Sequence, residues 1–150
     1  MHEINVQNIT QKKVVPTNAN LIYWSTITLK HLEIDAEINI RIVDLLEITE
    51  LNQKYRNKNK PTNVLSFPFD MPDEASDELL YLGDIVLCAE IINQEALNQN
   101  KLNDAHWAHM VIHGTLHLLG YDHENDTEAD IMEQLEITIL ESINFKNPYI

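Results

Sequence analysis

Apolar and polar residues alternate in some segments of the chain, and in others the apolar residues recur every three or four positions. Alternation is typical of a strand with one face in water, and the longer spacing is typical of an amphipathic helix. The clearest alternation lies at residues 36–43, where three isoleucines alternate with Glu37, Asn39 and Arg41. Further strands are predicted at residues 3–9, 64–67 and 79–89.

Five helices are predicted between and after these strands. The first follows a cap at Thr17 or Asn18, and the others are predicted at residues 45–56, 90–99, 105–119 and from about 126 onward. The order β-α-β-α-β-β-α-α-α indicates an α+β fold, with a small mixed four-stranded sheet packed by about five helices. No repeat or long linker divides residues 1–150, so we expect a single domain.

Some details of these elements are also predicted. Gly83 interrupts the strand at 79–89 and is expected to mark either a bulge or a close approach of another backbone segment, at a sheet edge beside a metal cleft. The acidic segment 70–78 is expected to be a mobile loop. Residues assigned to the buried faces of helices include Leu45, Leu46, Tyr55, Leu97 and Ile131.

Three histidines near the C-terminal end have the spacing of a metal site. His113 and His117 are four residues apart, so they project from one face of a helix. Gly120 can adopt the left-handed conformation that ends a helix and reverses the chain, which lets His123 approach the same ion. Three protein ligands leave a position for a metal-bound water, as in catalytic rather than structural zinc sites.

This spacing is that of the metzincin motif, H-E-x-x-H-x-x-G-x-x-H, on a metzincin-like metal-site helix. Gly114 stands where the motif has its general-base glutamate, which argues against ordinary metalloprotease chemistry. The alternative, a buried helix with satisfied core histidines, is less consistent with the glycine and the third histidine.

Other residues near the motif are assigned lesser roles. His109 lies eight residues from His117, about 12 Å along the helix, so it cannot share one ion with both of the other helical histidines. It is expected in the core or as a hydrogen-bond partner of a ligand, and Asp122 could orient an imidazole in the same way. His106 is expected to be exposed, and Met132 to pack in the core.

Composition restricts the classes of function. The chain has 150 residues, 44% of them hydrophobic, and it shows neither a signal peptide nor an apolar run of membrane-spanning length. Its single cysteine, Cys88, is expected in the core and fits a reducing cytoplasm. The formal charge of -14 is unfavourable for binding nucleic acid.

Basic residues are nevertheless concentrated in one segment, which contains Lys54, Arg56, Lys58 and Lys60. Such a segment could bind phosphate, or it could be a solvated charged run at the end of a helix, where the dipole favours cations. On charge alone, the second interpretation is favoured.

The sequence H-G-x-L-H-L-x-G-Y-D-H, at residues 113–123, resembles the signature of the YbeY family of bacterial metal-dependent endoribonucleases and ribosomal RNA maturation factors. Segments 55–69, 82–85 and 105–110 also resemble this family, in the same order along the chain. The resemblance implies single-stranded RNA as substrate, a role in ribosomal RNA processing and ribosome quality control, and the ribosome or assembly factors as partners.

The resemblance also implies site residues. Arg56 would be catalytic, holding a phosphate and stabilising developing charge. The residues expected to bind substrate are Arg56, Lys58, Lys60, Thr62, Asn63 and Ser66. The metal is expected to be zinc, although imidazole ligands also suit nickel and copper.

Several alternatives stay open at this point. The nucleophile is either the metal-bound hydroxide, a water assisted by a carboxylate from another loop, or the RNA 2′-hydroxyl. Besides the endoribonuclease, the competing functions are a ribosome-assembly factor with a mainly structural metal and, less consistent with Gly114, a metalloprotease.

Overall fold

A computed structural model describes residues 2–69 and 79–150. The predicted order of strands and helices is confirmed, and the acidic segment 70–78 lies outside the described residues. The elements are β1 (Glu3–Asn8), α1 (Asn18–His31), β2 (Ala36–Val43), α2 (Leu45–Arg56), β3 (Val64–Pro68), β4 (Leu80–Cys88), α3 (Ala89–Asn98), α4 (Asn103–Leu118) and α5 (Asp126–Ser142).

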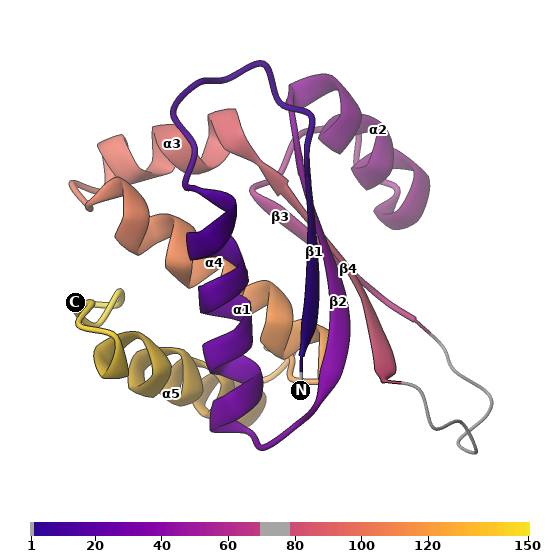
Figure 1. Cartoon of the computed structure of the whole chain (residues 1–150). Helices are drawn as coiled ribbons and strands as arrows, with labels where there is room; N and C mark the ends of the chain where they lie inside the picture. The colour runs from indigo at the N-terminus through magenta and orange to yellow at the C-terminus, as the bar shows by residue number, and fades with distance from the viewer. Residues whose placement is uncertain (1, 70–78) are drawn as a thin grey trace.

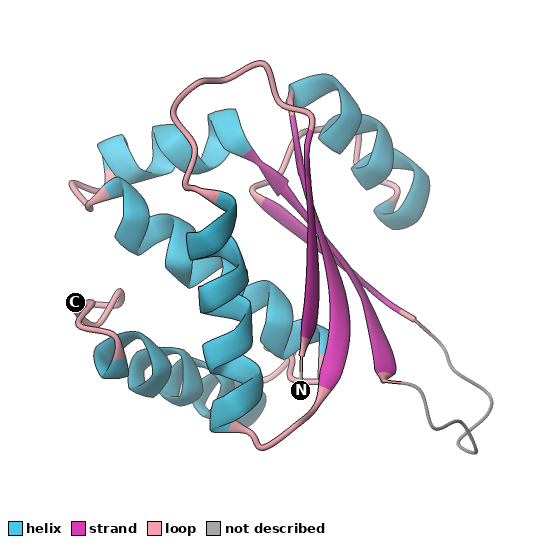
Figure 2. Ribbon diagram, in the orientation of Figure 1, coloured by secondary structure: helices cyan, strands magenta, loops and turns pink. Residues whose placement is uncertain are grey.

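The four strands form one mixed sheet in the order β1-β2-β4-β3. Strands β1, β2 and β4 are parallel, and β3 pairs antiparallel with β4 at the edge. Helices α1, α3, α4 and α5 lie on one side of the sheet, whereas α2 lies on the other side near one end (Figure 1). The coloured ribbon shows the same two-sided arrangement (Figure 2). The predicted α+β class is therefore confirmed.

The core lies between the sheet and α4, which contacts β3, β4, α1, α3 and α5. The isoleucines of β2 and Trp107 of α4 are at most 1% exposed. Cys88 and Met132 are buried, as predicted. Among the described residues, no helix is both long and apolar enough to cross a bilayer.

The bulge at Gly83 is confirmed, but its expected place at a sheet edge is wrong. The register between β2 and β4 shifts at Ile38, opposite Gly83, which has a φ of 139°. A Cβ at this position would lie 2.2 Å from the carbonyl oxygen of Phe67. Strand β4 is interior because β3 pairs along its other side. The missing side chain of Gly83 therefore lets the backbone of β3 approach closely.

Several apolar side chains assigned to buried helix faces are exposed instead: Leu45, Leu46, Tyr55, Leu97 and Ile131. Ile48 is the buried hydrophobic residue of α2, whereas α3 buries Ala89, Ile92 and Ala96. For α2 the reason is geometric, because this helix covers only one end of a small sheet and cannot bury a whole apolar stripe (Figure 1).

Candidate metal centre

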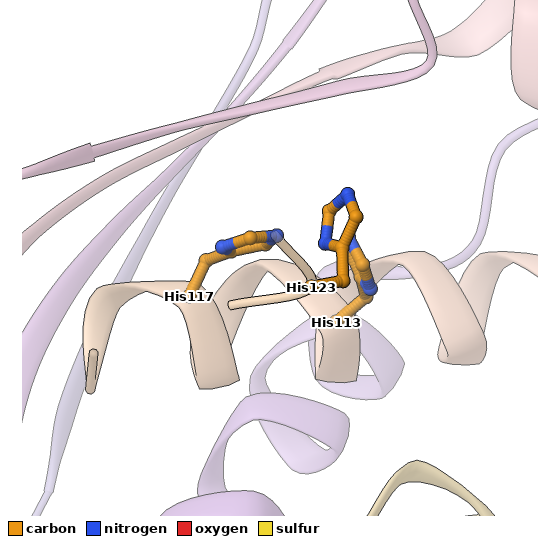
Figure 3. Close-up of side chains that lie close together, drawn as sticks. All are labelled: His113, His117 and His123. Carbon is orange, nitrogen blue, oxygen red and sulfur yellow. The ribbon is translucent and has the colours of Figure 1, made fainter. Parts of the chain in front are cut away.

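The three histidines of the motif lie together at the C-terminal end of α4. His113 and His117 project from one side of the helix, and the chain then reverses so that the ring of His123 stands beside them (Figure 3). Gly120 makes this reversal with a φ of 98°, and Tyr121 N donates to Leu116 O over 3.1 Å. One ring nitrogen from each histidine lies within 4.8 Å of the others.

The three rings differ in their surroundings. The ring centroids of His113 and His117 are 4.6 Å apart, and His123, with 59% of its side chain exposed, lies 5.7 and 5.2 Å from them. Burial, followed by the neighbouring His113 and His123, lowers the pKa of His117 to about 4. His117 is therefore neutral near pH 7, as a metal ligand must be. Three imidazole side chains are a donor set that fits zinc.

The buried carboxylate of Glu136 in α5 contacts this histidine cluster. Glu136 was not among the site residues predicted from the sequence. Its carboxylate is 1% exposed, with Oε2 2.6 Å from His113 Nδ1 and Oε1 2.8 Å from His109 Nε2. Tyr149 also donates its hydroxyl to Oε1. Burial alone would raise the pKa of Glu136, but the hydrogen bonds from His109 and His113 outweigh it and lower the pKa to about 2.

A signal for Glu136 was present in the sequence. It lies four residues from Met132 and from Leu140, on the stripe of α5 that is otherwise apolar and buried. A carboxylate on such a stripe requires a partner, because an unpaired buried charge is costly. His109 is buried, as one of its two expected roles requires, and its hydrogen bonds go to Glu136 and Tyr149 rather than directly to one of the three histidines.

A groove of about 730 Å³ lies over the histidines, between β3 with its preceding loop and the segment that joins α4 to α5. Its lining includes the three histidines and, among the residues predicted to bind substrate, Arg56, Thr62, Asn63 and Ser66. Lys58 and Lys60 line an adjoining hollow, which shares Arg56, Thr62 and Asn63 with the groove. Within residues 2–69 and 79–150, the exposed Arg56 makes no side-chain hydrogen bond or ion pair.

Ser66 and Gly114 explain how closely the edge strand approaches the helix. Ser66 Oγ donates to the carbonyl oxygen of Gly114 over 3.0 Å. A Cβ on Gly114 would lie 2.8 Å from Cγ2 of Ile85 in β4. The glycine that replaces the metzincin glutamate thus allows α4 to pack directly on the sheet, and the Ser66 hydroxyl already has a structural partner.

The loop that carries Lys58 and Lys60 is held by hydrogen bonds of buried and half-buried polar side chains. Asn52 is 1% exposed, and its Nδ2 donates to Lys60 O over 2.9 Å. Asn63 donates to Glu95 over 3.1 Å, and Glu95 also accepts a hydrogen bond from His106 over 2.9 Å. The expectation that His106 is exposed is therefore wrong. It is 3% exposed because α3 packs over the start of α4 and presents Glu95 to it.

Two acidic residues lie beside His123. Asp122 Oδ1 accepts the backbone N–H of His123 over 2.7 Å and lies 3.8 Å from its Nδ1. Glu124 lines the same groove. Asp122 thus fixes the backbone of this turn, and its carboxylate is close to the imidazole that it was expected to orient.

Known proteins resemble this chain over most of its length. The family model described as endoribonuclease YbeY matches residues 3–144. The endoribonuclease YbeY of Pseudomonas syringae pv. syringae (strain B728a) is 50% identical over 149 residues, which are 99% of this chain and 89% of that protein. The solution structure of TM1509 from Thermotoga maritima is 31% identical, with a TM-score of 0.63, and the match covers 95% of this chain and 89% of that one. The chain therefore belongs to the endoribonuclease YbeY family.

Proposed function

We propose that this protein is a metal-dependent endoribonuclease that cleaves single-stranded RNA, with His113, His117 and His123 holding one divalent metal ion. The observation that carries the proposal is the convergence of three imidazoles in a groove where Arg56 has no partner among the described residues. Family membership supports the reaction class.

Zinc is the proposed metal, because three imidazoles suit it, with nickel and copper as alternatives. Such an ion would lower the pKa of a bound water toward about 7 and polarise a phosphoryl oxygen. Burial and the neighbouring histidines keep His117 neutral, so its lone pair is available at neutral pH. His123, the most exposed of the three, comes from the turn and completes the set.

Arg56 is the proposed phosphate ligand. Its guanidinium is always charged, so it can hold a phosphate through two hydrogen bonds but cannot act as the base. Lys58 and Lys60 would bind the RNA backbone in the adjoining hollow. Thr62 would line both this hollow and the groove over the histidines. The side chains of Asn63 and Ser66 are already bonded to Glu95 and Gly114, so their contribution to substrate binding is to shape the groove wall.

The proposed cellular context is ribosomal RNA maturation and ribosome quality control in the cytoplasm, by one metallohydrolase domain formed by residues 1–150. A net charge of -14 repels RNA at long range, so the isolated chain should bind RNA weakly. The ribosome or an assembly factor would then supply part of the affinity. The single, unpaired Cys88 fits a reducing compartment.

The test is cleavage of a labelled single-stranded RNA by protein of measured metal content, with His117→Ala purified in parallel. Cleavage by the parent alone supports the proposal, whereas equal cleavage by both indicates a contaminating nuclease. Metal loss that unfolds the chain, with no RNA turnover by the parent, would favour an assembly factor with a structural metal. Cleavage of peptides instead of RNA would favour a metalloprotease.

A further inference from the structure

Glu136 is a carboxylate buried between two helices, and its two oxygens have different partners. Oε2 accepts a hydrogen bond from His113 Nδ1, and Oε1 accepts bonds from His109 Nε2 and the Tyr149 hydroxyl. Its side chain is 1% exposed, so water is not available to replace either partner. The carboxylate is therefore completely committed to side chains around the histidine cluster.

We infer that Glu136 is a positioning residue, which holds the proton of His113 on Nδ1 and so leaves the Nε2 lone pair free for the metal. This inference rests on the proposed metal site. A neutral imidazole carries its proton on either nitrogen, and a hydrogen bond from one nitrogen to a carboxylate selects the tautomer and fixes the ring. Because Glu136 belongs to α5 and His113 to α4, helix packing sets the orientation of the ring.

His109 and Tyr149 in turn hold Glu136. Both donors bind Oε1, so the carboxylate is fixed through its two oxygens rather than through Oε2 alone. Tyr149 lies near the C-terminal end of the chain and 40 residues from His109, so the segment after α5 closes the network. The network thus extends from this segment through Glu136 to His113.

The same residues could be considered a second metal site, since His109, His113 and Glu136 also lie within 4.8 Å of one another. The N···O separations of 2.6 and 2.8 Å oppose this interpretation. A nitrogen and an oxygen bound to one tetrahedral zinc, each at about 2.1 Å, lie about 3.4 Å apart. The observed separations are those of charge-assisted hydrogen bonds.

The test compares Glu136→Gln with Glu141→Gln, an exposed glutamate on the same helix that serves as a control for charge. Glutamine keeps the size of Glu136, but its amide can donate to Nδ1 and favour the wrong tautomer of His113. Two properties are measured on the full chain: metal affinity by chelator competition, and the His113 tautomer in metal-free protein from its ring ¹⁵N shifts, assigned with a His113→Gln sample.

We expect Glu136→Gln to bind metal about 10–100-fold more weakly and to shift His113 away from the Nδ1–H tautomer, while Glu141→Gln matches the parent. A folded Glu136→Gln protein with unchanged affinity and tautomer would overturn the inference. If this variant does not fold, Glu136→Asp replaces it. Its shorter side chain should weaken metal binding less but measurably, and unchanged affinity would again refute the role.

The two measurements separate this inference from the proposed function. If the parent binds no metal at these histidines, the proposed metal site fails. The tautomer in metal-free protein would still decide whether Glu136 orients His113. Circular dichroism and urea unfolding of each variant establish that a lost affinity does not reflect a lost fold.

Discussion

The Oγ atom of Ser66 lies 3.0 Å from the carbonyl oxygen of Gly114, joining the edge strand β3 to the helix that carries the histidines. This contact is possible because Gly114 has no side chain, and β4 occupies the space that a Cβ would need. The position that lacks the metzincin glutamate is therefore a packing position in this protein.

Gly114→Ala should destabilise the protein despite the better helix propensity of alanine. The new methyl group would meet Ile85 Cγ2 at 2.8 Å. Overpacking costs about 1–3 kcal/mol, and the propensity gain offsets about 0.8–1.0 kcal/mol of it, so a net loss on the order of 1 kcal/mol is expected in urea unfolding. In an Ile85→Ala background the same change should be neutral or stabilising. Equal destabilisation in both backgrounds would contradict this explanation.

Arg56→Ala should retain the metal and lose RNA cleavage. The guanidinium is exposed and makes no side-chain hydrogen bond or ion pair within the described part of the chain, so the free energy of unfolding should change by no more than about 0.5 kcal/mol. Losing a donor that stabilises transition-state charge should lower kcat by about 10²–10³-fold.

Bound metal should be lost in each of three separate variants, His113→Ala, His117→Ala and His123→Ala.

Lys54→Ala provides the control for Arg56, because Lys54 stacks over Tyr55 on the same helix and does not line the groove. Its kcat should match that of the parent. Full metal occupancy in all three histidine variants would disprove the metal site, and a fully active Arg56→Ala would remove Arg56 from the mechanism.

Metal-free protein should become less stable as the pH falls from about 6.5 toward 4. In the folded chain the pKa of His117 is lowered from 6.5 to about 4, first by burial and then by His113 and His123. Between these values the unfolded chain binds more protons at this position than the folded chain, so acid favours unfolding. Asp122 and Glu136 act in the opposite direction but do not reverse the shift.

The measurement is the urea midpoint of chelator-treated protein at pH 7 and pH 4.5, with His117→Gln as the comparison. Glutamine does not titrate, so the variant should lose less stability over this interval than the parent. An identical loss in both proteins would show that other groups carry the pH dependence.

Glu95→Gln should loosen the loop beside the groove without changing metal affinity. Burial alone would raise the pKa of Glu95, but hydrogen bonds from His106 and Asn63 lower it on balance. Weakening these bonds should cost about 1–3 kcal/mol of stability and speed hydrogen exchange in residues 57–63. The exposed Glu50→Gln is the control for charge. If hydrogen exchange in residues 57–63 of the Glu95 variant is as slow as in the parent, the hydrogen bonds of Glu95 do not hold the loop, and the bond from Asn52 to Lys60 O is sufficient.

The local elements of this protein are determined by its sequence. Strand β2 has the bounds that its alternation predicts, because burial of one face imposes a period of two. His113 and His117 share a face of α4 because helix geometry places residues four apart together, and Gly120 reverses the chain because it tolerates a positive φ. These relations span at most a few residues, so they can be predicted without the fold.

Only the tertiary structure decided the partners of those local elements. Glu136 meets His113 across 23 residues, and Asn63 meets Glu95 across 32, by the packing of one element on another. The burial of His106 and the exposure of Leu46 also depend on which helix covers which surface. Backbone periodicity specifies which face a side chain occupies, whereas the neighbour opposite that face is set by packing of the whole chain.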